Sequence, residues 1–205
     1  MKVYKTLQEK YWAGKFGEKY TMRNNDSKWI AANIKLFTKI FERTHSVHSL
    51  IEFGANVGLN LLAIKAILPD ISLSAIEINK ESVSKMVIKE CKVYPISILD
   101  FQPDYERDFV LCKGVLIHIN PEYLEKVYNL LYKTTNKYIC LVEYYNITPT
   151  EIKYRDKDGL LFKRDFAGEM LDIYSDLRLV DYGFIYHKDE NYPPDEMNWF
   201  LLEKP

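Results

Sequence analysis

The chain has 205 residues, of which 47% are hydrophobic and 14% aromatic, and its 28 Lys and Arg against 29 Asp and Glu give a formal charge of −1. This composition excludes disordered, collagen-like and low-complexity chains, which have far fewer apolar residues or far more Gly and Pro. A near-neutral chain with interspersed charges also lacks the basic surface that binds phosphate polyanions, so we expect no nucleic-acid partner. Length and composition predict a single folded domain over residues 1–205.

The cysteines and histidines show no metal-ligand spacing. Three cysteines are spaced too widely for a zinc or redox pair, and we interpret them as buried thiols of a reducing compartment: Cys91, Cys112 and Cys140. The remaining histidines outside the central region stand apart from carboxylates, so no metal site is expected: His45, His48 and His187. The sequence contains neither a signal-peptide pattern nor an apolar run of membrane-spanning length. These patterns predict a cytoplasmic protein without a membrane partner.

Residues 1–45 are expected to form a lid and a lead-in helix. The first 25 residues place aromatic side chains among Lys and Glu, and we interpret them as an irregular or helical lid: Tyr4, Tyr11, Trp12, Phe16 and Tyr20. From Ser27 to Phe41, apolar residues recur every three to four positions, which is typical of an amphipathic helix. Asp26 or Ser27 is in position to cap this helix.

Residues 46–205 are expected to form an α/β core. A short apolar run from residue 49 turns at glycine and continues into a helix that ends at Pro69, and residues 72–78 read as a second strand. Strand, helix and strand with short links predict a parallel βαβ unit. We further expect helices at residues 80–91 and after Pro121, and strands at residues 94–99, 109–112 and 138–142. Residues 177–186 and 197–202 predict a terminal antiparallel hairpin and therefore a mostly parallel, mixed sheet.

The loop after the first predicted strand indicates a nucleoside ligand. It has the pattern Glu-x-Gly-x-x-x-Gly, formed by Glu52, Gly54 and Gly58, which lets a backbone pass close to a ligand at a helix N-terminus. Glu77 ends the next strand 77 − 58 = 19 residues after the second glycine. An acidic residue at this spacing accepts hydrogen bonds from a ribose diol.

The same geometry serves dinucleotides and S-adenosylmethionine, and two residues distinguish them. Asn56 stands where a dinucleotide site needs glycine for the approach of pyrophosphate. The carboxylate of Glu52 would repel phosphates but attract a sulfonium and an ammonium group. An NAD-dependent short-chain enzyme would also need Tyr-x-x-x-Lys, whereas Tyr128 and Lys133 have the wrong spacing. The charge pattern therefore favours S-adenosylmethionine.

The motifs at residues 51–58 and 75–79 resemble those of class I S-adenosylmethionine-dependent methyltransferases. Almost the whole chain more narrowly resembles the bacterial pseudaminic acid biosynthesis-associated methylases. That resemblance rests on residues 11–20 with Arg23 and Asn24, and on residues 143–146, 161–169 and 198–204. It implies a Rossmann-like three-layer sandwich, S-adenosylmethionine as cofactor with S-adenosylhomocysteine as product, and a role in surface-glycan assembly.

Carried onto this sequence, the resemblance implies a set of donor-binding residues. Glu52, Gly54 and Gly58 would line the methionine and ribose portion, and Glu77 would hold the ribose hydroxyls. Asn79 would lie beside the adenosine, and Asp100 near the adenine amino group. Apart from the resemblance, we expect the aromatic lid to close over the donor, with Arg23 or Tyr20 reaching the methionine carboxylate, and the alternative is that these aromatic residues only pack in the core. The further residues assigned to the donor are Tyr11, Trp12, Asn56, Asn60, Ile78, Leu99, Lys113 and Gly114.

Candidates for the chemistry follow the fourth and fifth strands, at the sheet edge where ligands bind. His118 is the leading candidate for a general base, and the alternative is that it only packs or hydrogen-bonds a backbone. Glu143 and Tyr144 are the other catalytic candidates, while Tyr145 and Asn146 would bind the acceptor. Lys163 and Arg164, expected in a charged loop, would hold a phosphate or carboxylate of the acceptor or form a surface ion-pair cluster.

These features lead to two functional hypotheses. The first is a methyltransferase acting on an oxygen or nitrogen of a small polar acceptor, such as a sugar-derived or phosphorylated intermediate of capsule or flagellin-glycan assembly. The second is a non-catalytic S-adenosylmethionine-binding or scaffold protein of the same pathway. Turnover to S-adenosylhomocysteine separates them, and either a monomer or a homodimer fits the sequence.

Overall fold

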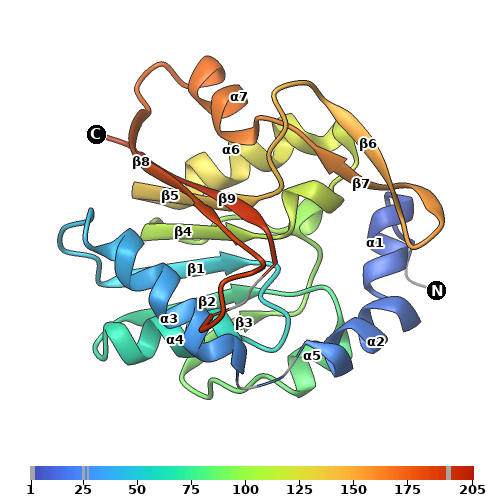
Figure 1. Ribbon diagram of the computed structural model, residues 1–205, viewed down its shortest axis with the longest axis horizontal. Helices are drawn as coiled ribbons and strands as arrows, with labels where there is room; N and C mark the ends of the chain where they lie inside the picture. The colour runs from blue at the N-terminus through green and yellow to red at the C-terminus, as the bar shows by residue number, and fades with distance from the viewer. Residues whose placement is uncertain (1–2, 25, 27, 193–194) are drawn as a thin grey trace.

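The computed structural model describes residues 3–24, 26, 28–192 and 195–205. Its centre is a seven-stranded sheet in the order β3-β2-β1-β4-β5-β9-β8 (Figure 1). The strands are β1 (Ser49–Phe53), β2 (Ser72–Ile76), β3 (Cys91–Tyr94), β4 (Arg107–Lys113), β5 (Thr135–Glu143), β8 (Arg178–Ile185) and β9 (Met197–Glu203). β1 to β5 are parallel, and β9 pairs antiparallel with both β5 and β8. The predicted fold class is confirmed.

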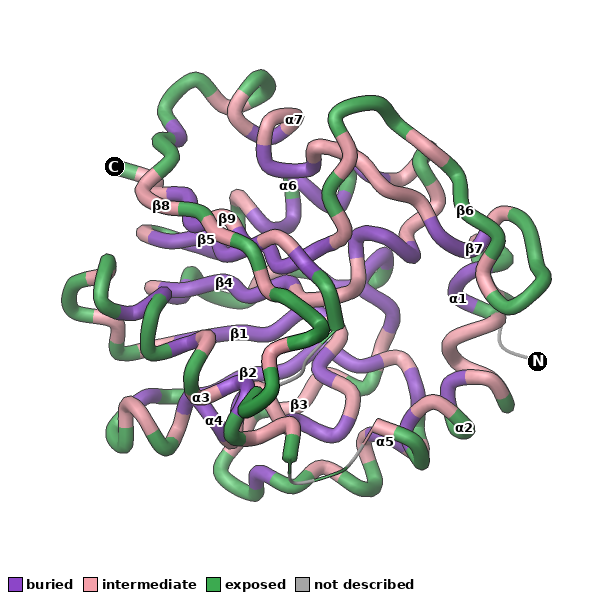
Figure 2. The backbone as a smooth tube through the Cα atoms, viewed as in Figure 1, coloured by how far each residue is buried: buried purple, intermediate pink, exposed green. Residues whose placement is uncertain are grey.

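Helices cover both faces of the sheet and make three layers (Figure 1). α3 (Lys28–Phe41) and α4 (Leu59–Ile67) pack on one face, where Phe37, Ile40 and Leu61 are fully buried. α6 (Leu124–Thr134) and α7 (Phe166–Ile173) pack on the other, around Val127 and Met170. Each such side chain stabilises the fold by about 1.5–3 kcal/mol. The buried strands between the layers stand out in Figure 2.

The expected lead-in helix is present, and its cap is partly defined. α3 begins at Lys28, whose backbone N–H donates to the Asp26 carboxylate at 2.9 Å. This contact fits the expected capping role of Asp26, whereas Ser27 lies outside the described residues.

Two predicted boundaries after β2 are wrong. α5 (Lys80–Ser84) is a single short helix rather than one reaching Cys91, and β3 lies at residues 91–94 rather than 94–99. The chain leaves the helix early because Met86 and Ile88 turn back against the glycine loop, where the Val87 N–H donates to the Val57 carbonyl at 2.9 Å. Residues 98–100 instead form the 3-10 helix η1 (Ile98–Asp100).

A second, two-stranded sheet was not anticipated. β6 (Thr150–Tyr154) and β7 (Lys157–Lys163) form an antiparallel hairpin whose turn residues Arg155 and Asp156 have φ of 50° and 62°. This hairpin lies beside α1 (Leu7–Trp12) and α2 (Lys15–Arg23), next to the carboxyl ends of the parallel strands (Figure 1). The N-terminal lid is therefore helical, and the hairpin is its partner.

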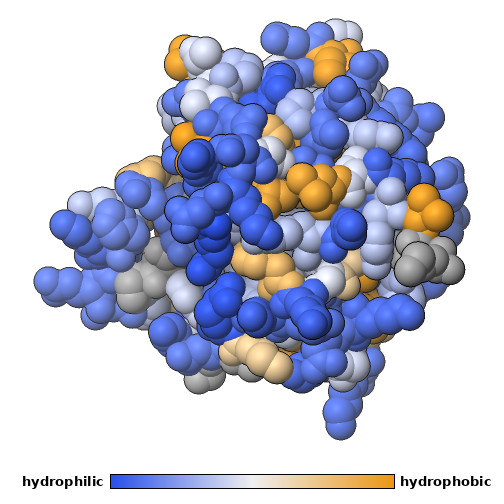
Figure 3. All heavy atoms as spheres, turned by 90° about the vertical axis from the view of Figure 1, so that its right-hand side faces the viewer, coloured by the Kyte–Doolittle hydropathy of each residue, from blue (hydrophilic) through white to orange (hydrophobic). Residues whose placement is uncertain are grey.

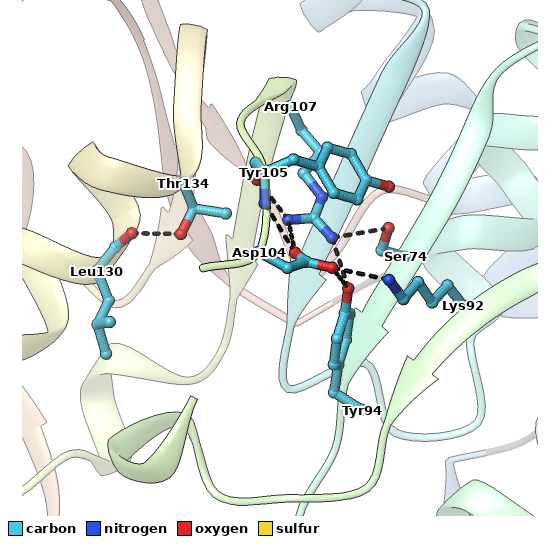
Figure 4. A network of polar contacts seen from close by, with 8 residues as sticks. All are labelled: Ser74, Lys92, Tyr94, Asp104, Tyr105, Arg107, Leu130 and Thr134. Atoms are coloured by element: carbon cyan, nitrogen blue, oxygen red, sulfur yellow. Dashed lines mark hydrogen bonds and ion pairs between the residues drawn. The ribbon is translucent and has the colours of Figure 1, made fainter. Parts of the chain in front are cut away.

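A buried arginine, Arg107, begins β4 and fixes the loop that precedes this strand. Arg107 is fully buried and donates to Asp104 at 2.6 Å, to the Tyr105 carbonyl at 2.6 Å and to the Tyr94 hydroxyl at 2.8 Å (Figure 4). Lys92 donates to the same Asp104 carboxylate at 2.7 Å. Because burying an unpaired charge is costly, this network fixes the loop before β4 rather than leaving it free.

Candidate functional site

A cavity of about 220 Å³ opens at the carboxyl ends of β1, β2 and β4, beneath α1 and α2. Figure 3 views the molecule from this side and shows apolar side chains among a mainly hydrophilic surface. The cavity brings together many residues singled out in the sequence: Trp12, Tyr20, Gly54, Asn56, Asn60, Glu77, Ile78, Asn79, Leu99, Lys113, Gly114 and His118. It lies at the sheet edge where open α/β sheets bind ligands.

The loop between β1 and α4 has left-handed backbone at three positions. Gly54, Asn56 and Gly58 have φ of 75°, 50° and 82°. A Cβ on Gly54 would lie 2.6 Å from the Val115 side chain, and one on Gly58 would lie 2.5 Å from the Met86 sulfur. The glycines are thus required by the backbone and by neighbouring side chains, and Gly54 also lines the cavity.

Glu52 is a buried carboxyl behind the cavity wall. Its Oε1 accepts a hydrogen bond of 2.5 Å from the Asn60 amide, which lines the cavity. Its Oε2 is buried and has no hydrogen-bond partner among the described residues. Burial raises the pKa of Glu52 to about 8, although Asn60 and Lys113 act in the opposite direction. A positively charged group in contact with this oxygen would offset the cost of burying its negative charge.

Glu77 directly follows β2 at the cavity and orders the backbone around it. Its two oxygens accept from the Asn56 N–H at 2.8 Å and the Asn79 N–H at 2.6 Å. Burial raises the pKa of Glu77, opposed by these backbone hydrogen bonds. The carboxylate therefore stands where both the glycine loop and the start of α5 meet the cavity.

The lid helices are tied to this loop by hydrogen bonds. The Asn79 amide donates to the Trp12 carbonyl at 2.8 Å, while its oxygen caps α5. The Thr21 hydroxyl donates to the Asn56 side chain at 2.9 Å. Glu9 of α1 accepts from the Ser97 hydroxyl near η1. Both functions of the Asn79 side chain are thus used within the protein, although the residue lines the cavity.

An aromatic cluster joins the lid to the hairpin, and only part of it lines the cavity. The Trp12 ring lies 4.6 Å from the His118 ring, and the Tyr154 ring lies 5.0 Å from it on the hairpin side. Tyr11 stacks on Phe16 outside the cavity. The guanidinium of Arg23 lies 5.9 Å from the Phe16 ring. Tyr11 and Arg23, both expected at the donor, are not among the residues that line the cavity.

His118 is held in one orientation at the cavity wall. It lies in η2 (Leu116–His118), is 8% exposed, and its Nδ1 is 2.6 Å from the Leu160 carbonyl of β7. Because a carbonyl only accepts, Nδ1 carries the proton and Nε2 carries the lone pair. Nε2 has no hydrogen bond among the described residues. Burial lowers the pKa of His118 to about 4, so the ring is neutral at physiological pH.

Glu143 faces the loop that carries His118 rather than the cavity. Its Oε1 accepts from the Val115 and Leu116 N–H groups, both at 2.9 Å, and its Oε2 accepts from the Ile117 N–H at 3.4 Å. This carboxyl, expected to meet an acceptor, accepts from the backbone of residues 115–117 and is not among the residues that line the cavity. Burial raises its pKa to about 7, against these hydrogen bonds.

The other residues expected at the acceptor or the adenine also lie off the cavity wall. The Lys163 ammonium lies 5.2 Å from the Tyr144 ring, and Arg164 pairs with Glu169 at 2.7 Å. Lys163 ends β7 instead of lying in a loop. The Tyr145 ring lies 5.9 Å from the Phe200 ring at a tilt of 42°, and the Asn146 amide donates to the Thr148 carbonyl at 2.6 Å. Asp100, expected near the adenine, forms an ion pair with Lys5 and is not among the residues that line the cavity.

The α3 side of the cavity was missed in the sequence. Trp29 and Asn33 line it from α3, and Asp195 and Met197 from the segment before and at the start of β9. The available signal was Asn33, a polar residue at a buried position of an otherwise apolar helix face. Lys113 lines the same side, and burial lowers its pKa while Glu52 and Asp195 oppose the shift.

The described residues contain neither a metal-ligand cluster nor a membrane-spanning helix. Among the described residues, no group of three or more His, Cys, Asp or Glu side chains is arranged to hold a metal ion. Within the same part of the chain, no helix combines the length and apolar character needed to cross a bilayer.

Sequence similarity to known proteins covers only part of the chain. No family model matches the chain. An uncharacterized protein of Rickettsia prowazekii (strain Madrid E) is 31% identical over an alignment of 108 positions that covers 49% of this chain. The chain spans only 43% of the length of that relative.

Solved structures resemble the chain over nearly its full length. The 1,6-didemethyltoxoflavin-N1-methyltransferase of Burkholderia thailandensis, with S-adenosylhomocysteine bound, has a TM-score of 0.68 at 10% identity and covers 100% of this chain and 93% of its own. Magnesium protoporphyrin IX methyltransferase of Synechocystis PCC 6803 with bound SAM has a TM-score of 0.66 at 9% identity, covering 99% and 100%. The plantazolicin methyltransferase BpumL scores 0.64 at 13% identity, covering 97% and 94%. The chain has the Rossmann-like fold of these methyltransferases.

Proposed function

We propose that this chain is an S-adenosylmethionine-dependent methyltransferase acting on an oxygen or nitrogen of a small polar acceptor. The observation that carries the proposal is the pair of buried carboxyls, Glu52 and Glu77, at the carboxyl ends of β1 and β2 beside one cavity. The fold supports it, because structural neighbours with S-adenosylmethionine or S-adenosylhomocysteine bound share this sheet and its helices.

The residues present fit this donor. The unpartnered Oε2 of Glu52 lies where a cationic group of the donor would be stabilised, and the same carboxylate would repel a pyrophosphate. Glu77 would accept from ribose hydroxyls, while Ile78 and Leu99 supply apolar cavity wall for a purine. When bound, S-adenosylmethionine supplies a methyl group on a sulfonium for in-line displacement.

The chain itself would align the acceptor and accept its proton. The Leu160 carbonyl keeps the proton of His118 on Nδ1, which leaves Nε2 as the acceptor atom at the cavity. Glu143 fixes the backbone of residues 115–117 and so sets the height of His118 above the sheet. Trp12 and the lid limit the access of water to this region.

The finer assignment rests on the sequence resemblance to pseudaminic acid biosynthesis-associated methylases. It places the acceptor among sugar-derived or phosphorylated intermediates of bacterial surface-glycan assembly. A cytoplasmic, single-domain protein acting as a monomer or homodimer belongs to the same proposal.

Calorimetric titration with S-adenosylmethionine, S-adenosylhomocysteine and NAD tests the donor. We expect binding of the first two and no binding of NAD, and tight NAD binding would overturn the proposal. Formation of S-adenosylhomocysteine with a panel of sugar nucleotides then tests turnover. Donor binding without turnover on any acceptor would favour the non-catalytic alternative. His118→Gln should slow turnover without weakening donor binding.

A further inference from the structure

Three cations gather on one pair of stacked rings where the lid meets the hairpin of β6 and β7. The rings of Tyr11 and Phe16 stack with their centroids 4.1 Å apart. The Lys157 ammonium lies 4.8 Å from the Tyr11 ring. The guanidinium carbons of Arg23 and Arg155 lie 5.9 Å and 6.0 Å from the Phe16 ring. Two distant parts of the chain therefore bring three positive charges around the same two side chains.

These three cations are exposed, and none forms an ion pair with a carboxylate among the described residues. The acidic residues of the same elements are placed otherwise: Asp158 pairs with Lys153 at 3.9 Å, and Glu18 and Asp156 form no ion pair in this part of the chain. The whole chain has a formal charge of −1, so the cluster does not belong to a generally basic surface. Like charges held together repel one another, and a bound anion would remove that repulsion.

The aromatic rings position the cations before anything binds. Phe16 and Arg23 are seven residues apart on α2, two turns of helix, and therefore lie on the same face. Burial raises the pKa of Tyr11, whereas Arg155 and Arg23 oppose the shift, so both guanidiniums act on one hydroxyl. Each cation over a ring gains about 0.5–1 kcal/mol at an exposed site. A side chain that is already held on a ring loses less entropy when it binds a ligand.

The number of positive charges selects a phosphate over a carboxylate. A carboxylate has a single negative charge, which one guanidinium can match in a bidentate pair. A phosphate ester carries about −1.5 to −2 charges at neutral pH and offers three oxygens to donors. Guanidinium groups match the geometry of phosphate, and an ammonium adds a point charge. A nucleic acid is not favoured, because it requires a basic surface that extends beyond one cluster.

The cluster lies one layer of rings outside the cavity. The Phe16 ring is 5.8 Å from the Tyr154 ring, which is 5.0 Å from the ring of His118. The Phe16 ring is also 5.2 Å from the ring of Trp12. Trp12 and His118 both line the cavity, whereas Phe16 and Tyr154 do not. A small molecule held by its phosphate at the cluster would have its remaining part close to the cavity.

We propose that Arg23, Arg155 and Lys157 bind a phosphate group of the acceptor outside the cavity. The inference rests on the proposed function and narrows its acceptor to a phosphorylated molecule. It replaces Lys163 and Arg164, the cations expected from the sequence to hold such a group, because both have partners elsewhere. A phosphate shared by α2 and the hairpin would also hold the lid against the hairpin.

The first test titrates the full chain with inorganic phosphate and follows the amide NMR signals of residues 15–23 and 150–163. Sodium acetate at equal ionic strength is the comparison probe. Arg23→Gln, Arg155→Gln and the double variant remove charge from the cluster, and Arg155→Lys keeps it. Lys133→Gln, which removes an exposed lysine of α6, is the matched control for net charge.

Phosphate should shift signals in both segments, and acetate should bind more weakly. Each single Gln variant should weaken phosphate about 3-fold, because an exposed ion pair contributes little, and the double variant about 10-fold. Arg155→Lys should retain most of the affinity, and added salt should lower it. Shifts in neither segment, equal binding of acetate, or an equal loss in Lys133→Gln would overturn the phosphate site.

The second test compares turnover of acceptors that differ only by a phosphate group, such as sugars and their phosphate esters. The phosphorylated acceptor should have the lower KM, and the double variant should raise that KM about 10-fold with kcat and the affinity for S-adenosylmethionine unchanged. Inorganic phosphate should compete with the phosphorylated acceptor. Equal KM values for the two acceptors, or activation by inorganic phosphate, would overturn the assignment of the site to the acceptor.

Failure of this proposal and failure of the proposed function give different results. If the chain does not bind S-adenosylmethionine, the methyltransferase proposal fails, and the titration with inorganic phosphate still decides whether the cluster is an anion site. If the chain binds S-adenosylmethionine and phosphate shifts no signals in α2 and the hairpin, the methyltransferase proposal stands and the phosphate site is refuted.

Discussion

Replacing Glu52 by Gln should raise the free energy of unfolding of the ligand-free protein and weaken its binding of S-adenosylmethionine. Glu52 is fully buried, has one hydrogen bond from Asn60 and leaves one oxygen unpartnered. Burial raises its pKa to about 8 from the ordinary value of 4.5. Between these two pH values the folded protein holds a proton that the unfolded chain has lost, so the free energy of unfolding falls as pH rises.

The expected magnitude follows from the width of that window. Each pKa unit corresponds to about 1.4 kcal/mol, so ionisation of Glu52 in the unfolded chain lowers the free energy of unfolding by about 3 kcal/mol at pH 7. Gln has the same shape and no proton to lose. The stability of Glu52→Gln relative to the unmodified chain should therefore increase by about 1.4 kcal/mol per pH unit above pH 4.5 and level off above pH 8.

Urea unfolding of both proteins at pH 5, 6, 7 and 8 measures this difference, with the exposed Glu42→Gln as control. Glu52→Gln should also bind S-adenosylmethionine about 10-fold more weakly or worse, because a charged partner for the donor is lost. Donor binding should release a proton from Glu52, which calorimetry detects as a dependence on the ionisation enthalpy of the buffer. A pH-independent stability difference, or a less stable Glu52→Gln at pH 8, would refute this account of Glu52.

Three further results are expected. Arg107→Met should lower the free energy of unfolding in urea by about 3–5 kcal/mol, because it leaves a buried polar network without its cation. Lys92→Met, which removes the exposed cation from the same carboxylate, should change it little. Equal effects of the two substitutions would contradict the role of Arg107 as the cation of the network. Glu143→Gln should accelerate amide hydrogen exchange at residues 115–117 by about 10-fold or more, since one carboxylate accepts all three N–H groups, and unchanged protection would show that the loop needs no such anchor. In an NMR titration the His118 ring should stay neutral with its proton on Nδ1 down to about pH 4, and a midpoint near 6.5 would mean that the ring is solvated.

The sheet could be predicted from the sequence because each of its strands carries a local signal. Buried runs such as those in β1 and β5 are apolar on both sides, and the glycine loop marks the turn into α4. The hairpin of β6 and β7 was missed because its turn uses Arg155 and Asp156 rather than Asn-Gly, and because β6 is largely exposed. Its existence depends on packing against the lid, which no local pattern contains.

The residues of the site also divide into those that local sequence predicts and those that depend on distant parts of the chain. The positions of Gly54 and Glu77 follow from a strand, a turn and a spacing, all of which are local. The orientation of Glu143 does not, because its partners are backbone groups of the loop after β4, 26 to 28 residues earlier. The position of Asp100 likewise depends on Lys5, its ion-pair partner, which lies 95 residues earlier in the chain. The contribution of Trp29 and Asn33 to the cavity becomes visible only once α3 is laid over β4.

The bond from His118 to the Leu160 carbonyl ties the proton state of the ring to a part of the fold that the main sheet does not need. The hairpin of β6 and β7 could vary in length or sequence among related proteins without disturbing the seven-stranded sheet. Any such change that moved this carbonyl would remove the group that holds the proton of His118 on Nδ1. The hairpin therefore sets the tautomer of a residue that lines the cavity, although no described residue of β6 or β7 lines the cavity itself.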